Sequence, residues 1–411
     1  MKIKSPAARL LCAATACLGT LAAISANPAL AGAEEQAAQI HSRLTGVKPS
    51  VGVLTAMAEE IANGNAEVAA HLAMDNDAFY NVTLKNLVTP WTNRDGDNFA
   101  PLNDYTATVI GMVRDDVDFR EILSGDILYT GTGASGLNLP AYSNSNNNHY
   151  EALENSGYPL QSALQRQPQS SVTGLPSEAT AGVMTTRGGA KAFFYAGTNR
   201  AMFRFTLMNH LCRDLEQVHD TSRPPDRIRQ DVSRSPGGDS RVFQNNCIGC
   251  HSGMDPMAQA FAYYNFAYDV ENDPTGENGQ IDYNRSGDTD PATGTRVQAK
   301  NHINSATFPY GFVIPDDKWD NYWRQGPNMH LGWSETLPGS GNGAKSMGQE
   351  LANSQAFAQC QVTKVFEQVC LRAPEDQADR DQIENITSNF TGNGYKLKQV
   401  YADTAVYCAG E

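Results

Sequence analysis

Two cysteines three positions apart, followed directly by a histidine, constrain this chain more than any other pattern in it. They are Cys247, Cys250 and His251. Cys-x-x-Cys-His is the attachment pattern of c-type haem. On one helical turn, thiols at this spacing can each reach a vinyl group of the porphyrin, and the next residue can present its imidazole to the iron. We therefore predict one covalent haem c, with Cys247 and Cys250 as anchors and His251 as the proximal iron ligand.

Other uses of the same pattern fit the chain less well. A thioredoxin-like dithiol would be expected after a strand-helix-strand pattern, and none precedes this motif. A zinc site would need a second pair of ligands at short spacing, which the sequence lacks. The remaining alternative is a chance occurrence of a short pattern.

The first 31 residues have the composition of a secretory signal peptide. Lys2, Lys4 and Arg9 form a basic start, an apolar stretch follows, and an Ala-Leu-Ala cleavage site lies at 29–31. The apolar stretch is short for a membrane span, and no later segment approaches the necessary length. We predict a periplasmic or secreted protein with no membrane span after removal of the signal.

The charge balance limits the partners. The chain has 31 Lys and Arg against 45 Asp and Glu, a formal net charge of -14. Without the predicted signal, 28 basic residues remain against 45 acidic ones, a net charge of -17. Such a chain repels nucleic acid and anionic lipid. A redox partner protein with a basic surface is the expected partner.

Four further cysteines remain in the predicted mature chain: Cys212, Cys360, Cys370 and Cys408. An even number in an exported protein predicts two disulfides. Cys360 and Cys370 share a predicted helix and lie about 15 Å apart at 1.5 Å per residue, too far to bond. Two pairings remain open. We favour Cys370 with Cys408 and Cys212 with Cys360 over Cys360 with Cys408 and Cys212 with Cys370, because an antiparallel final helix would bring Cys408 to the end of its partner.

The hydrophobic pattern predicts a mostly α fold with long irregular loops. We expect a signal peptide over 1–31, a helical N-terminal domain over 32–235 that is loop-rich at 130–180, and a cytochrome c-like haem domain with C-terminal helices over 236–411. Helices are expected at 50–90, 105–113, 119–123, 191–218, 242–250, 344–371, 379–390 and 395–407.

Four segments resemble one known family. They are Cys247-Ile-Gly-Cys-His-Ser-Gly-Met-Asp-Pro-Met257, Asp118–Asp126 followed by Tyr129-Thr130, Asn199–Cys212 followed by Arg223-Pro-Pro225, and Leu351–Cys360. Together they are similar to the planctomycete-type cytochrome c domains of uncharacterised bacterial proteins, over roughly residues 70 to 410. The resemblance implies a mostly helical, exported monohaem protein.

The second axial ligand of the iron decides the chemistry. A methionine sulfur suits electron transfer, a histidine lowers the potential, and an open position permits peroxide chemistry. Met254 and Met257 follow His251 too closely and are expected to be packing residues. Met329 is the first candidate for the distal ligand, and the adjacent His330 is the second.

These observations favour an electron-transfer cytochrome over two alternatives. One alternative is a haem-dependent oxidoreductase, oxidase or peroxidase-like, with an open distal site. The other is an exported interaction protein in which haem is structural. The aromatic run 261–268, with Trp323 or Trp333, is expected to supply apolar walls of the haem pocket. No catalytic residue is assigned from the sequence.

Overall fold

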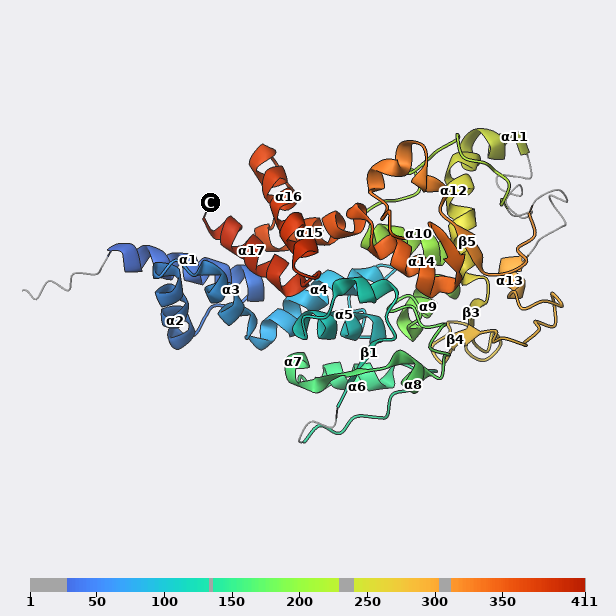
Figure 1. Cartoon of the computed structure of the whole chain (residues 1–411). Helices are drawn as coiled ribbons and strands as arrows, with labels where there is room; N and C mark the ends of the chain where they lie inside the picture. The colour runs from blue at the N-terminus through green and yellow to red at the C-terminus, as the bar shows by residue number, and fades with distance from the viewer. Residues whose placement is uncertain (1–27, 133–135, 229–239, 303–311, 411) are drawn as a thin grey trace, which may run out of the picture.

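The computed structural model describes residues 28–132, 136–228, 240–302 and 312–410 (Figure 1). Of the predicted signal peptide, only the last four residues fall within this part of the chain, at the start of a helix; the rest lies outside the described residues. Helices dominate the described ranges and the few strands are short, so the predicted mostly α class is confirmed. None of the described helices combines the length and the apolar character needed to cross a membrane.

The first half of the chain begins, in the described residues, with a helix of 18 residues and continues with shorter helices and turns. They are α1 (Pro28–Thr45), α2 (Val51–Ala62), α3 (Ala66–Met74), η1 (Phe79–Leu84), α4 (Lys85–Val88), η2 (Thr89–Trp91), α5 (Asp104–Arg114), η3 (Phe119–Leu123), α6 (Asn148–Asn155), α7 (Leu160–Ala163), α8 (Gln169–Thr173), α9 (Arg187–Phe194) and α10 (Asn199–His210).

The second half is also mostly helical and ends in three long helices of 16, 16 and 13 residues. They are α11 (Ser240–Val242), η5 (Phe243–Cys247), α12 (Ile248–Ala258), η6 (Gln259–Phe261), α13 (Ala299–His302), η7 (Tyr322–Arg324), η8 (Pro327–Leu331), α14 (Gly343–Ala352), α15 (Gln355–Cys370), α16 (Gln377–Gly392) and α17 (Leu397–Ala409).

The described strands form three small antiparallel pairs. They are β1 (Leu128–Gly131) with β2 (Leu164–Gln167), β3 (Tyr264–Ala267) with β4 (Gln280–Tyr283), and β5 (Lys318–Asp320) with β6 (Ser340–Asn342). In register, Tyr129 faces Arg166, Phe266 faces Ile281 and Trp319 faces Gly341. The sheets therefore brace loops between helices and form no layer of their own.

The two ends of the chain lie side by side. In Figure 1 the N-terminal helices α1 and α3 pack beside the C-terminal helix α17. One continuous core of buried apolar side chains runs from Ala33 to Ala409. The predicted domain boundary near residue 235 falls in 229–239, outside the described residues, and side chains from both sides of it share this core.

The expectation of one helix over 191–218 was wrong. The chain forms α9 and α10, separated by residues 195–198, and it leaves the helix after His210. The Thr198 hydroxyl accepts a hydrogen bond from the Arg200 N–H and caps a new helix, which is a local signal that the apolar pattern conceals. At Cys212 the backbone takes a left-handed conformation (φ 53°), which ends the helical run before the two prolines.

Both favoured disulfides are present. Cys212 is bonded to Cys360 and Cys370 to Cys408, with Cα–Cα distances of 5.3 and 5.5 Å. Cys360 and Cys370 share α15 as predicted, and α17 packs along that helix. Helix length excluded a Cys360–Cys370 bond, and the expected antiparallel return of the last helix selected the pairing that is observed.

Candidate haem-attachment site

The motif occupies the junction between a π-helical turn and an α-helix. The π turn η5 ends at Cys247, and α12 begins at the next residue, carrying Cys250 and His251 in its first turn. π turns recur at functional sites because they change the direction of the side chains that follow. Positions i, i+3 and i+4 share one side of a helix, so both thiols and the imidazole project from the same side.

The cysteines of the motif differ from the other four of the predicted mature chain. Cys247 and Cys250 are free thiols, each half-buried. Burial raises the pKa of the Cys250 thiol, and the neighbouring Cys247 and the acidic Glu216 act in the same direction. A thiol with a raised pKa is a poor nucleophile for disulfide exchange, so the geometry disfavours a thioredoxin-like use of the pair.

Two glycines form the back of the motif helix. Gly249 and Gly253 lie two residues to either side of His251, about half a turn away from it. A Cβ on Gly253 would lie 1.9 Å from Nε1 of Trp323, and one on Gly249 would lie 2.3 Å from Nε2 of His219. Only glycine lets these two rings approach the helix backbone so closely.

Backbone and side-chain contacts hold α12 to the preceding loop. The Asp220 N–H donates to the Gly249 carbonyl at 2.9 Å, and the Ser252 hydroxyl donates to the Asp220 carbonyl at 3.0 Å. The Cys250 thiol contacts the Leu215 carbonyl at 3.4 Å. The loop around 215–220 therefore positions the motif helix, a role that sequence reasoning had not assigned to it.

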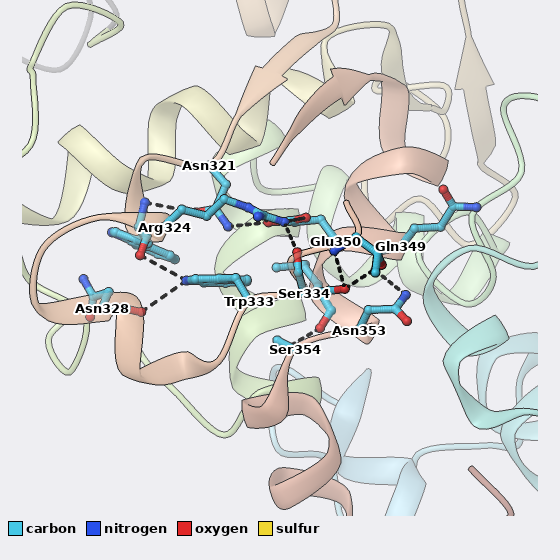
Figure 2. Close-up of polar contacts among 12 residues, drawn as sticks. Asn321, Arg324, Asn328, Trp333, Ser334, Gln349, Glu350, Asn353 and Ser354 are labelled. Atoms are coloured by element: carbon cyan, nitrogen blue, oxygen red, sulfur yellow. Dashed lines mark hydrogen bonds and ion pairs between the residues drawn. The ribbon is translucent and has the colours of Figure 1, made fainter. Parts of the chain in front are cut away.

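A buried polar network fixes the turn that carries Trp323 (Figure 2). The Arg324 guanidinium donates to both carboxylate oxygens of Glu350, each at 2.8 Å, and Glu350 is only 1% exposed. Asn321 donates to the same carboxylate at 2.8 Å. The Trp333 indole N–H lies 3.0 Å from the Trp323 carbonyl oxygen. These contacts hold η7 rigidly behind α12.

Trp323, which with Trp333 as the alternative was expected to supply an apolar wall of the haem pocket, lies behind the motif helix. Its indole packs on Gly253, on the opposite face of α12 from His251, and is fully buried there. Trp323 therefore supports the motif helix from behind. The sequence could not reveal this, because which face of a short helix is covered depends on the elements packed against it.

A small apolar cluster does lie beside the imidazole. Phe243 and Ile228 are buried together, and Cys247 and Ile248 pack against them, apart from the main core. The Phe243 ring centroid lies 5.8 Å from that of His251. Sequence reasoning missed this cluster, although an apolar residue four positions before the first cysteine was a usable signal.

The candidates for the distal ligand lie in η8. Met329 is 60% exposed. Nδ1 of His330 is engaged by the Pro327 carbonyl of its own turn at 2.6 Å. The Asn328 side chain donates to the Val218 carbonyl at 2.9 Å, which ties η8 to the loop that positions the motif helix. Met329 as distal ligand stays a prediction.

The two methionines after the motif are buried in the main core. Met254 and Met257 belong to the same cluster of apolar side chains as Phe261. This agrees with the expectation that they are packing residues.

The donor groups of the motif have the arrangement that covalent haem attachment would need. In the part of the chain that the structure describes, no three His, Cys, Asp or Glu side chains gather as a directly bound metal would require. The two thiols and the imidazole instead project side by side from one turn. A haem needs this spread, because the thiols attach at its edge while the imidazole addresses its centre.

Comparisons of the chain with protein-family models, with curated protein sequences and with solved structures found no match. The resemblance to planctomycete-type cytochrome c domains therefore stays a prediction.

Proposed function

We propose that this protein is an exported monohaem c-type cytochrome that transfers electrons. Cys247 and Cys250 would attach the haem through thioethers, and His251 would bind the iron from the proximal side. One observation supports this most directly. Four of the six cysteines of the predicted mature chain are paired in disulfides, whereas the two in the motif stay free beside an imidazole.

The surroundings of the motif fit the same function. Phe243 and Ile228 offer an apolar surface next to His251 for one side of a porphyrin. The glycine face of α12 is anchored on Trp323, so the thiols and the imidazole are held at constant separation. Rigid ligands reduce the reorganisation that accompanies a change of charge on the iron. When bound, the haem supplies a one-electron couple of its iron.

The charge near the motif supports a basic partner. Glu216 is exposed, and its negative charge is close enough to the motif to act on the Cys250 thiol. The whole chain is acidic as well. A redox partner with a basic surface would be steered to such a region, faster at low ionic strength than at high.

Covalent haem is tested by the mass of the mature protein. The full chain is produced in a bacterial host with active periplasmic haem-ligation machinery. We expect the mass to exceed that of the signal-cleaved chain by one haem. Cys247→Ala/Cys250→Ala should lack this increment, while the control Cys212→Ala/Cys360→Ala, which removes a disulfide, should retain it. An unmodified wild-type mass in the presence of active ligation machinery would refute the proposal.

Carbon monoxide separates the two redox functions. An electron-transfer haem with two protein ligands should show a reduced spectrum that carbon monoxide leaves unchanged. A spectrum that carbon monoxide shifts at once would contradict electron transfer and support a haem-dependent oxidoreductase with an open distal site.

A further inference from the structure

The imidazole of His251 is held by a carboxylate from its own helix. Nδ1 of His251 lies 2.9 Å from Oδ1 of Asp255, one turn later in α12. The Asp255 side chain is 2% exposed, while that of His251 is 20% exposed. A buried carboxylate is therefore in contact with a partly exposed imidazole of the same helix.

The contact determines which ring nitrogen is available. A carboxylate accepts hydrogen bonds, so the proton of the neutral ring lies on Nδ1. Nε2, on the far side of the ring from Asp255, then presents its lone pair. Histidines that bind metals usually have their other ring nitrogen held by such a partner, which orients the ring and raises its basicity.

Burial of Asp255 gives the contact its strength. Removing a carboxylate from water is costly unless it is compensated by hydrogen bonds or charge. In a site of low polarity, the negative charge acts strongly on the ring that it contacts. The buried Phe243 ring, whose centroid lies 5.8 Å from that of the imidazole, adds apolar surface beside the pair.

We propose that Asp255 is the positioning residue of the proximal ligand: it fixes the His251 tautomer, makes the imidazole a strong electron donor to the haem iron, and thereby stabilises the oxidised state. This inference rests on the proposed function and deepens it, because it assigns a haem of low reduction potential. The iron would lose its electron more readily to an acceptor than it would with a proximal histidine held by a neutral acceptor.

The first test uses the haem-free chain and does not depend on haem attachment. Long-range proton–nitrogen NMR at about pH 8 reports the tautomer of each neutral histidine. We expect His251 to carry its proton on Nδ1 in the wild type, and Asp255→Asn to shift the population toward the Nε2 tautomer. A wild-type ring protonated mainly on Nε2 would overturn the proposal, whatever the outcome of the haem experiments.

The second test compares reduction potentials of the haem-loaded protein. Asp255→Asn removes the charge at nearly constant shape, and Asp255→Glu restores it. The matched control is Asp220→Asn, which also removes a buried negative charge near α12. The backbone of Asp220 contacts Gly249, but its carboxylate contacts Arg223 and Ser222. We expect Asp255→Asn to raise the reduced-to-oxidised ratio about tenfold at fixed applied potential, equivalent to about 59 mV for one electron. Asp220→Asn should change the ratio less than half as much.

The outcomes separate the two proposals. If the wild type carries haem and the two asparagine variants shift equally, or not at all, the role of Asp255 falls and the cytochrome function stands. If the wild type carries no haem, the proposed function falls, and the inference falls with it. If Asp255→Asn does not retain haem, Asp255→Glu decides. A reduction potential of Asp255→Glu equal to that of the wild type supports the role of the charge. A reduced-to-oxidised ratio about tenfold higher than that of the wild type, at the same applied potential, refutes it.

Discussion

Two regions of this protein use pairs of cysteines in opposite ways. In the C-terminal bundle (α15, α16 and α17), Cys370 and Cys408 come from different helices and are bonded to each other. In the motif turn (residues 247–251), Cys247 and Cys250 lie on one turn and stay free. Both regions would experience the same predicted oxidising compartment. The position of each thiol and what surrounds it therefore decide between a structural crosslink and a pair of free thiols.

The same regions differ in how completely the chain covers them. The inner face of α15 is buried through Phe357, Val365 and Val369, and Ser354 caps the helix through the Phe357 N–H. The thiol and imidazole side of the motif turn is half exposed. The C-terminal bundle, whose inner face is buried by its own side chains, is expected to serve stability. The motif turn, which presents two thiols and an imidazole on a half-exposed side, is expected to serve binding.

Removing the disulfide of the C-terminal bundle should have the largest effect on stability. Cys370→Ala/Cys408→Ala opens a crosslink between residues 38 apart in sequence, which should cost about 4 kcal/mol of unfolding free energy. Denaturant unfolding measures the loss, and the mass of the mature protein measures haem attachment. The comparison of the two regions predicts lower stability with full haem content. A parallel loss of haem in folded protein would contradict it.

The ion pair behind the motif turn should rank next. Arg324→Met leaves the buried Glu350 carboxylate without its cation, at a cost of about 2–4 kcal/mol, reduced from a fully buried pair because Arg324 is partly exposed. Arg324→Met/Glu350→Met removes both charges and should be more stable than the single variant. Denaturant unfolding of all three proteins checks this order, and a double variant less stable than Arg324→Met would refute it.

The two glycines of α12 provide a sharper test of the same region. Gly253→Ala pushes a methyl group into the buried Trp323 and should cost about 1–3 kcal/mol. In Gly249→Ala the added methyl group approaches the ring of His219, which is exposed and can move away. Alanine also has a higher helix propensity than glycine, worth up to about 1 kcal/mol. We expect Gly249→Ala to be close to the wild type in unfolding free energy. Equal losses in the two variants would mean that the back of the helix is not fixed by Trp323.

Acid should weaken the C-terminal bundle by a smaller amount. The Arg372 guanidinium, together with the Glu375 N–H and the Tyr407 hydroxyl, holds the pKa of Asp379 below its ordinary value of 3.8. The unfolded chain therefore binds this proton first as the pH falls. The stabilisation is complete above about pH 4 and is lost progressively below it.

The pH dependence of unfolding between pH 2 and 6 measures this contribution. Asp379→Asn should flatten the acid limb of the profile. Asp381→Asn, which changes an exposed carboxyl on the same helix α16, should leave the limb unchanged. Equal flattening in both variants would assign the effect to net charge and not to the buried contact.

Much of the helical fold was predictable because its signals are local. Apolar spacing indicated α2, α5 and the C-terminal helices. The length of α15 excluded a Cys360–Cys370 bond, and the expected antiparallel return of the last helix selected the correct disulfides. The helix expected over 191–218 failed because the capping hydroxyl of Thr198 outweighs an apolar pattern that continues through it. The three strand pairs were not predicted, because strands of three or four residues leave little periodicity in a sequence.

The sequence alone determined the chemistry available at the motif turn: two thiols and an imidazole at fixed spacing on one side of a helical turn. It also placed Gly249 and Gly253 about half a helical turn from His251, and Asp255 one turn after it. Only the tertiary structure decided which partner each of these residues has. Trp323 lies against Gly253 and Phe243 beside His251 because elements distant in the chain are brought together by burial of apolar surface, and no local pattern encodes that arrangement.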